Sequence, residues 1–259
     1  MTLLDQSLCL LDGISPEAEI RLRRKGVLSC RQLASEAELH LSPAHAARVR
    51  ASFAEMDKAE SLGLADWFVN HLPAGHRVRA LMQFMPDASF YDIETDGMSQ
   101  SSQITCISVL RAGRLETFVQ GRNLEGFLEA WACSKILAGF NSKRFDTPAV
   151  CRRFGLTRIP AQVDLMDEAR HYGCRGGLKS IEKTAGFSRT ARQCLDGRNA
   201  IHLWCEYKHS GSEEALNALV EYNRDDVRSL LHLAKHLARL SLDNTGIRFD
   251  WPDAVGSLK

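Results

Sequence analysis

The first sixty residues alternate apolar and polar positions with the spacing of amphipathic helices. Serine followed by proline marks two of the helix starts, since serine caps the free N–H groups and proline fits the first turn. The pattern predicts four helices: Leu3–Leu11, Ser15–Gly26, one beginning near Ser29, and one beginning at Ser42-Pro43. Residues 1–61 are therefore expected to form a small all-α domain.

Further along, short apolar runs bounded by turn residues indicate strands. They are expected around Ala88–Ile93, Ile104–Leu110, Leu115–Val119 and Lys135–Asn141, with a helix over Leu124–Cys133. Ala112-Gly113 forms a turn between the second and third of these strands, so we expect the first three to form a meander. The order β-β-β-α-β, followed by further helices, predicts an α/β domain with a mixed β-sheet flanked by helices over residues 62–240. We interpret residues 62–87 as a connecting segment and 241–259 as a C-terminal tail.

Composition narrows the class of protein without identifying it. No run of eighteen apolar residues occurs, so we predict no transmembrane helix and no membrane partner. The N-terminus lacks the basic-then-apolar pattern of a signal peptide. Eight cysteines without a Cys-x-x-Cys pair favour reduced, mostly buried thiols and a cytoplasmic location.

Charge is uneven along the chain although the formal net charge is only +1. Residues 143–195 hold eleven lysines and arginines against five acids, a difference of +6. Such a segment suits a phosphate backbone, and a solvated surface is the simpler interpretation.

Two acids in the first predicted strand, Asp92 and Glu94, are the first candidates for chemistry. Side chains alternate along a strand, so both point to one side, about 7 Å apart. Neighbouring carboxylates repel each other and are costly to bury. A hard divalent cation such as Mg²⁺ or Mn²⁺ removes that cost. Asp-x-Glu is a short motif, however, and is by itself weak evidence of catalysis.

Two later motifs carry further candidates. Asp146 follows the fourth predicted strand in Asn141-Ser142-Lys143-Arg144-Phe145-Asp146, at the sheet edge where α/β proteins bind ligands. Taken alone, an aspartate there is a helix cap. Tyr222 and Asp226 lie four apart on an amphipathic helix and share a face, whereas Asp225 points elsewhere. Taken alone, that pair is an ordinary packed tyrosine beside an acid.

Together, the three motifs resemble those of DnaQ-like 3′–5′ exonucleases, which have a ribonuclease H-like fold. The tyrosine is similar to that of the DEDDy branch, and the last two motifs resemble those in proofreading domains of family B DNA polymerases. The DEDDh branch is excluded because Glu221 stands where that branch has histidine. Gly176-Gly177-Leu178-Lys179-Ser180-Ile181-Glu182 and Tyr222-Asn223 resemble the bacterial YprB-like exonucleases. The resemblance covers about residues 62–240.

The resemblance implies that Asp92, Glu94, Asp146 and Asp226 bind two Mg²⁺ or Mn²⁺ ions. Two cations can stabilise both the attacking and the leaving oxygen of a phosphodiester. It also implies that Tyr222 orients the attacking water. Since tyrosine ordinarily loses its proton only near about pH 10, orientation is a more suitable role than that of a general base.

Several residues are candidates for nucleic-acid contact. Lys179 follows two glycines near a helix start, and Asn141 opens the second motif. The segment from Leu11 to Val27 resembles a helix-hairpin-helix motif, with Gly13 in the hairpin and Ser15 where the family has glycine. Arg24 belongs to an acid-free basic run beside it. A small helical bundle with a solvated charged face is the alternative for this region.

We therefore expect a metal-dependent 3′–5′ exonuclease acting on DNA or RNA. Two alternatives stay open. One is a non-catalytic module on the same fold that binds nucleic acid or protein, although such a module has no reason to keep mutually repelling carboxylates together. The other is a structure-specific endonuclease, which shares the metal chemistry and differs in product length.

Overall fold

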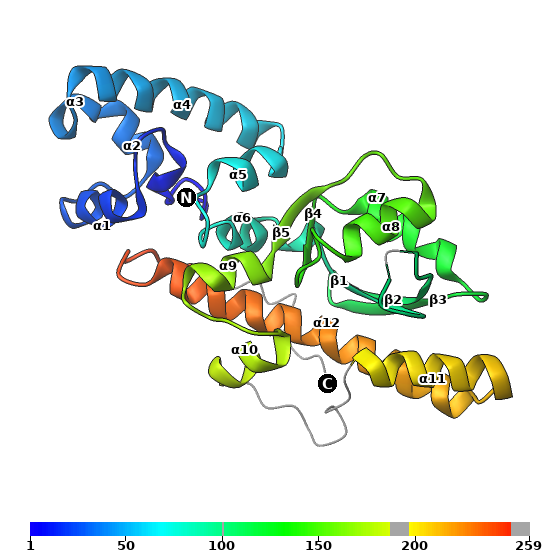
Figure 1. Ribbon diagram of the computed structural model, residues 1–259. Coiled ribbons are helices and arrows are strands. Elements are labelled where there is room, and N and C mark those ends of the chain that lie inside the picture. The colour runs from blue at the N-terminus through cyan, green and yellow to red at the C-terminus, as the bar shows by residue number, and fades with distance from the viewer. Residues whose placement is uncertain (100, 187–196, 250–259) are drawn as a thin grey trace.

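The computed structural model describes residues 1–99, 101–186 and 197–249 (Figure 1). Its centre is a five-stranded sheet in the order β3-β2-β1-β4-β5. The strands are β1 (Ala88–Thr95), β2 (Ile104–Arg111), β3 (Arg114–Val119), β4 (Ile136–Gly139) and β5 (Ala161–Asp164). β1, β2 and β3 are antiparallel neighbours, which confirms the predicted meander. β4 pairs with β1 and with β5 in parallel, so the mixed sheet is also confirmed.

Helices cover both faces of this sheet. The long helix α12 crosses one face, and α7 and α8 lie against the other (Figure 1). The helices on the N-terminal side are α1 (Pro16–Arg24), α2 (Cys30–Ser35), α3 (Ala37–His40), α4 (Pro43–Ser61), α5 (Ala65–His71) and α6 (Val78–Gln83). The others are α7 (Phe127–Cys133), α8 (Asp146–Phe154), α9 (Leu165–His171), α10 (Leu178–Thr184), α11 (Gly197–Ser210) and α12 (Glu213–Leu242).

The alternation of side chains along β1 divides this strand between the two faces. Tyr91 and Ile93 belong to the hydrophobic cluster that contains Phe127 of α7. Phe90 belongs to the cluster that contains Leu230 of α12. Because the period is two, the next residues on the α12 face are Asp92 and Glu94. The packing of β1 therefore directs both acids toward α12.

One sequence-based expectation near the N-terminus was wrong. Residues Leu3–Leu11 form turns and a single 3-10 helix, Leu8–Leu10, in place of one α-helix. Nearly all of their side chains are buried, and the Ser7 hydroxyl donates to the Leu3 carbonyl. Packing on all sides overrides the helical spacing of the leucines. Residues 62–87, interpreted as a connecting segment, contain α5, α6 and the 3-10 helix Met85–Asp87.

The N-terminal helices share their core with the sheet domain. One hydrophobic cluster contains Leu3 and Leu33 from the N-terminal side together with Phe90 of β1 and Leu230 of α12. A buried ion pair also connects the two parts. Arg79 Nη1 of α6 lies 2.8 Å from Glu19 Oε2 of α1, and both side chains are 0% exposed.

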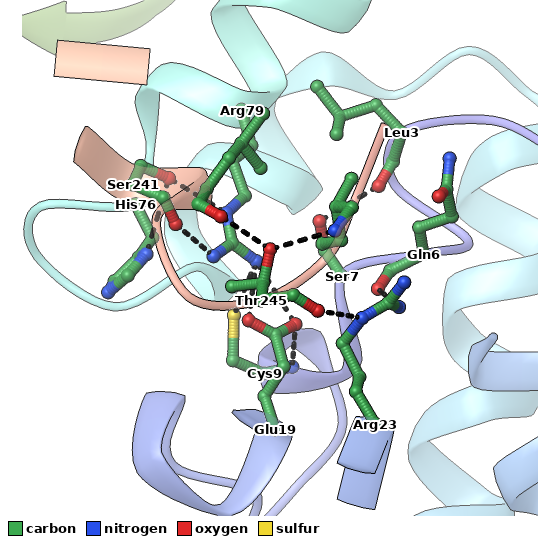
Figure 2. A network of polar contacts seen from close by, with 12 residues as sticks. Leu3, Gln6, Ser7, Cys9, Glu19, Arg23, His76, Arg79, Ser241 and Thr245 are labelled. Atoms are coloured by element: carbon green, nitrogen blue, oxygen red, sulfur yellow. Dashed lines mark hydrogen bonds and ion pairs between the residues drawn. The ribbon is translucent and has the colours of Figure 1, made fainter. Parts of the chain in front are cut away.

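Further hydrogen bonds extend this pair to the end of α12, as Figure 2 shows. Arg79 Nε donates to Ser241 Oγ at 2.8 Å, and Arg79 Nη2 donates to the Ser241 carbonyl. The second Glu19 oxygen accepts from the Cys9 N–H. Burial, reinforced by the charge of Arg79, lowers the pKa of His76 to about 3, so this neighbour is neutral at pH 7. The Arg79 guanidinium therefore has Glu19 as its counter-charge and neutral acceptors in Ser241 and Cys9.

Other expectations concern the cysteines and the C-terminal tail. The seven cysteines in the described ranges are free thiols; Cys9, Cys30 and Cys106 are buried, whereas Cys133 and Cys205 are exposed. α12 continues to Leu242, past the expected start of the tail at 241. Residues 250–259 of that predicted tail lie outside the described residues. No helix in the part of the chain that the structure describes has the length and apolar character needed to span a bilayer.

Glu19→Ala should lower the free energy of unfolding by about 3–5 kcal/mol, because it leaves the buried Arg79 charge without its partner. Denaturant unfolding of the purified protein measures this effect. Glu38→Ala is the matched control, since it breaks the exposed Glu38–Arg50 pair in the same region and should change stability little. Equal effects of the two substitutions would show that the buried pair does not connect the two parts energetically.

Candidate metal centre

Three carboxylates from two distant parts of the sequence meet on the α12 face of the sheet. Asp92 and Glu94 come from β1, and Asp226 comes from α12. Each offers an oxygen, and these oxygens all lie within 4.8 Å of one another. We call these three residues the carboxylate cluster. The structure thus confirms that Asp92 and Glu94 point to the same side.

Asp146, the fourth acid of the sequence motifs, lies beside this cluster. It begins α8, and its Oδ1 accepts a hydrogen bond from the Ile93 N–H at 3.2 Å. Ile93 stands between Asp92 and Glu94, so this bond holds Asp146 against the backbone of the same strand. Asp146 does not belong to the group whose oxygens lie within 4.8 Å of one another. The side chain is 4% exposed and contributes charge at close range.

Burial, and for Asp92 and Glu94 also mutual repulsion, raises the pKa values of these acids. Burial raises the pKa of Asp92 well above its usual range, and the neighbouring carboxylates, Asp146 foremost, raise it further. Burial and then the Asp226 charge do the same for Glu94. Burial raises the pKa of Asp146 from 3.8 to about 7. Like charge at this density is unfavourable without a counter-charge.

A divalent cation fits this donor set. Carboxylate oxygens are the ligands preferred by Mg²⁺ and suit Mn²⁺, and Asp92, Glu94 and Asp226 can all reach one ion. When bound, the cation would compensate both the burial of these carboxylates and the repulsion between them. Asp146, placed beside the cluster, is the available ligand for a second ion.

Tyr222 and Lys179 border the cluster. Tyr222 is one turn before Asp226 on α12 and is 8% exposed. Lys179 of α10 places its Nζ 4.9 Å from the centre of the Tyr222 ring. Its positive charge also acts to lower the pKa of Glu94, which places it near the cluster. The sequence candidates Tyr222 and Lys179 are therefore brought together with the acids.

Asn141 lies in the loop that positions Asp146. Its N–H donates to Asp164 Oδ1 at 2.9 Å, and the Lys143 N–H donates to Asp164 Oδ2 at 3.2 Å. Asp164 also accepts from the Met166 N–H and so caps the start of α9, directly after β5. The Asn141 carbonyl in turn accepts from the Phe145 N–H. The loop between β4 and α8 is thus held at both ends.

Sequence reasoning missed the role of Asn223. Its Nδ2 donates to Asp92 Oδ2 at 2.8 Å, and the residue is 0% exposed. The residue was noticed only as part of the Tyr222-Asn223 resemblance. The sequence feature that could have indicated this role is a polar amide on the sheet-facing side of an amphipathic helix. Its partner Asp92 could not be predicted, because it lies 131 positions away.

The hairpin candidates lie apart from the cluster. Gly13, Ser15 and Arg24 belong to the region of α1, at the far end of the molecule from β1 (Figure 1). Ser15 Oγ accepts from the Ala18 N–H and donates to Glu17 Oε2 at 2.7 Å. The helix start therefore already has an acceptor and a nearby carboxylate, where a phosphate would need free donors. Phosphate binding by this hairpin stays a prediction.

Part of the basic segment is neutralised within the chain. Arg144 and Arg170 both pair with Asp167, and Arg153 pairs with Glu125. Arg189 and Arg192 lie outside the described residues. Lys179 is the basic residue of this segment whose charge acts on an acid of the cluster, Glu94.

Comparison with known proteins gives two findings. Residues 89–238 match the family model described as RNase_H superfamily. A solved structure of the family B DNA polymerase from the hyperthermophilic archaeon Pyrobaculum calidifontis is similar at a TM-score of 0.48 and 20% sequence identity. That match covers 60% of this chain and 26% of the polymerase chain. No curated protein matches the sequence.

Mn²⁺ should raise the melting temperature more at about pH 8 than at about pH 5, because protons compete for the ligand oxygens. Without the cation, the raised pKa of Asp146 makes the folded state bind more protons than the unfolded state from about pH 4 to about pH 7. Stability contributed by this group therefore falls as pH rises through that window, and Mn²⁺ offsets the loss. Scanning calorimetry with EDTA or Mn²⁺ measures both effects.

Asp226→Asn should remove most of the Mn²⁺ effect at the higher pH. Asp225→Asn is the matched control, since that neighbouring carboxylate pairs with Arg228 and is not among the clustered oxygens. A Mn²⁺ effect that is the same at both pH values, or the same in Asp226→Asn as in the wild type, would contradict a metal centre here.

Proposed function

The chain belongs to the RNase_H superfamily, and on that premise we propose that it is a metal-dependent 3′–5′ exonuclease of the DEDDy type. The substrate would be nucleic acid, and the reaction would be hydrolysis of its phosphodiester bonds. The observation that carries the proposal is the carboxylate cluster, whose three oxygens lie within 4.8 Å of one another. The order of the three sequence motifs supports the exonuclease type.

Each residue of the site has a proposed task. Asp92, Glu94 and Asp226 would hold the first cation, and Asp146 would help to hold a second. Bound divalent cations supply a Lewis acid for the attacking and leaving oxygens and acidify bound water. Tyr222 would orient the attacking water through its hydroxyl group, as the resemblance of its motif to the DEDDy branch implies.

Lys179 would contact the phosphate of the substrate. A lysine is a flexible point charge that suits a phosphate oxygen. Its present partner is the aromatic face of Tyr222, at 4.9 Å from the ring centre, and its charge also acts on Glu94. An incoming phosphate would therefore meet a positive charge next to a cluster that is otherwise negative.

The test is cleavage of 5′-labelled DNA and RNA, single-stranded and duplex, with Mg²⁺ or Mn²⁺. We expect products that shorten stepwise from the 3′ end, and no cleavage of circular single strands, which have no end. Asp226→Asn should abolish cleavage while the fold persists, because it removes a metal ligand and no core packing. Asp225→Asn should cleave at close to the wild-type rate.

The outcomes separate the competing functions. Cleavage of circular strands would favour an endonuclease on the same fold. Binding of nucleic acid without cleavage under every condition would favour a non-catalytic module. Wild-type rates for Asp226→Asn would show that the carboxylate cluster is not the catalytic centre.

A further inference from the structure

Asn223 is a fully buried polar residue that donates a hydrogen bond to the carboxylate cluster. It lies between Tyr222 and Asp226 on α12, and all three side chains face the sheet with at most 9% of their surface exposed. Burying an amide costs free energy unless its polar atoms find partners. A hydrophobic residue would be the ordinary choice at such a position, so the amide requires a specific reason.

The single partner of this amide among the described residues is Asp92. Asn223 Nδ2 donates to Asp92 Oδ2 at 2.8 Å, well within the range of N–H···O hydrogen bonds. Asn223 Oδ1 is buried and has no hydrogen-bond partner in the part of the chain that the structure describes. The bond to Asp92 therefore orients the amide, and the amide in turn orients the carboxylate.

The chemistry of the donor is as informative as its position. An asparagine amide donates hydrogen bonds but carries no charge. It can fix one oxygen of Asp92 and leave the other free, while the net negative charge of the cluster is unchanged. An arginine or lysine in the same place would neutralise part of the cluster and compete with a cation. A neutral donor therefore suits a carboxylate that must keep its charge for a metal ion.

We propose that Asn223 is a positioning residue that holds the Asp92 carboxylate in the orientation required for binding a divalent cation. The inference rests on the proposed metal-dependent function and extends it to a residue beyond the carboxylates and Tyr222. Asn223 acts through Asp92 and takes no part in the reaction itself. Residues in such a position are typically responsible for 10–100-fold in metal affinity.

The experiment is calorimetric titration of Mn²⁺ into the purified full-length protein without substrate. Asn223→Leu removes the donor and keeps a similar volume, and we expect it to weaken Mn²⁺ binding by about 10–100-fold. Asn223→Asp keeps the shape but places an acceptor against Asp92, so it should weaken binding more. If Asn223→Leu does not fold, Asn223→Ser, which is too short to reach Asp92, takes the same measurement.

Ser89→Ala is the matched control. Ser89 is a buried polar residue of the same strand, three positions before Asp92, and its Oγ lies 2.6 Å from Ser134 Oγ. Its loss should reduce stability without changing the affinity for Mn²⁺. A purely structural role of Asn223 predicts the same behaviour for Asn223→Leu, and that result would overturn the inference.

Cleavage kinetics give a second readout. Asn223→Leu should need about 10–100-fold more Mn²⁺ for half-maximal cleavage and should approach the wild-type rate at saturation. Mn²⁺ binding by the wild type with unchanged affinity in the Asn223 variants would contradict this inference alone. Absence of Mn²⁺ binding by the wild type would contradict the inference together with the proposed function.

Discussion

Repulsion between carboxylates that the fold holds together is the constraint on which this structure depends. β1 directs Asp92 and Glu94 to one face because strand side chains alternate, and α12 brings Asp226 to the same place. The three oxygens lie within 4.8 Å of one another, and Asp146 is bonded to the backbone between the two strand acids. Such an arrangement persists in a folded protein only when protons or cations compensate the charge.

The buried ion pair of Arg79 and Glu19 differs from the carboxylate cluster in how its charge is compensated. Arg79 and Glu19 are fully buried at the junction of α1, α6 and the end of α12, and they compensate each other at 2.8 Å. The carboxylate cluster near the middle of α12 has a nearby lysine, Lys179, against several acids. The same helix thus passes one centre whose charge is balanced by an ion pair and another whose charge must be compensated by protons or a cation. That difference supports a metal centre more strongly than the sequence motifs alone.

The parts of this site that were predicted from sequence depend on local geometry. The period of a strand places Asp92 and Glu94 together, and four residues of helix place Tyr222 on the face of Asp226. The meander follows from the order of three consecutive apolar runs and from the two-residue turn between β2 and β3. These features require no knowledge of long-range packing.

What escaped prediction depends on contacts between distant residues. The spacing of Leu3–Leu11 fits a helix, but burial on all sides favours turns. Glu19 and Arg79 are 60 positions apart, and Asn223 and Asp92 are 131 apart. In neither pair can one residue be predicted as the partner from the sequence around the other. The separate position of Asp146 depends on its bond to the backbone of β1, which no motif encodes.

The central claim is that the carboxylate cluster binds a divalent cation. A crystal of the protein grown with Mn²⁺ tests it most directly, because anomalous scattering locates manganese independently of any assumed chemistry. We predict a peak within direct coordination distance of Asp92, Glu94 and Asp226 oxygens. A crystal with the three carboxylates in the described arrangement and no anomalous peak between them would contradict the account.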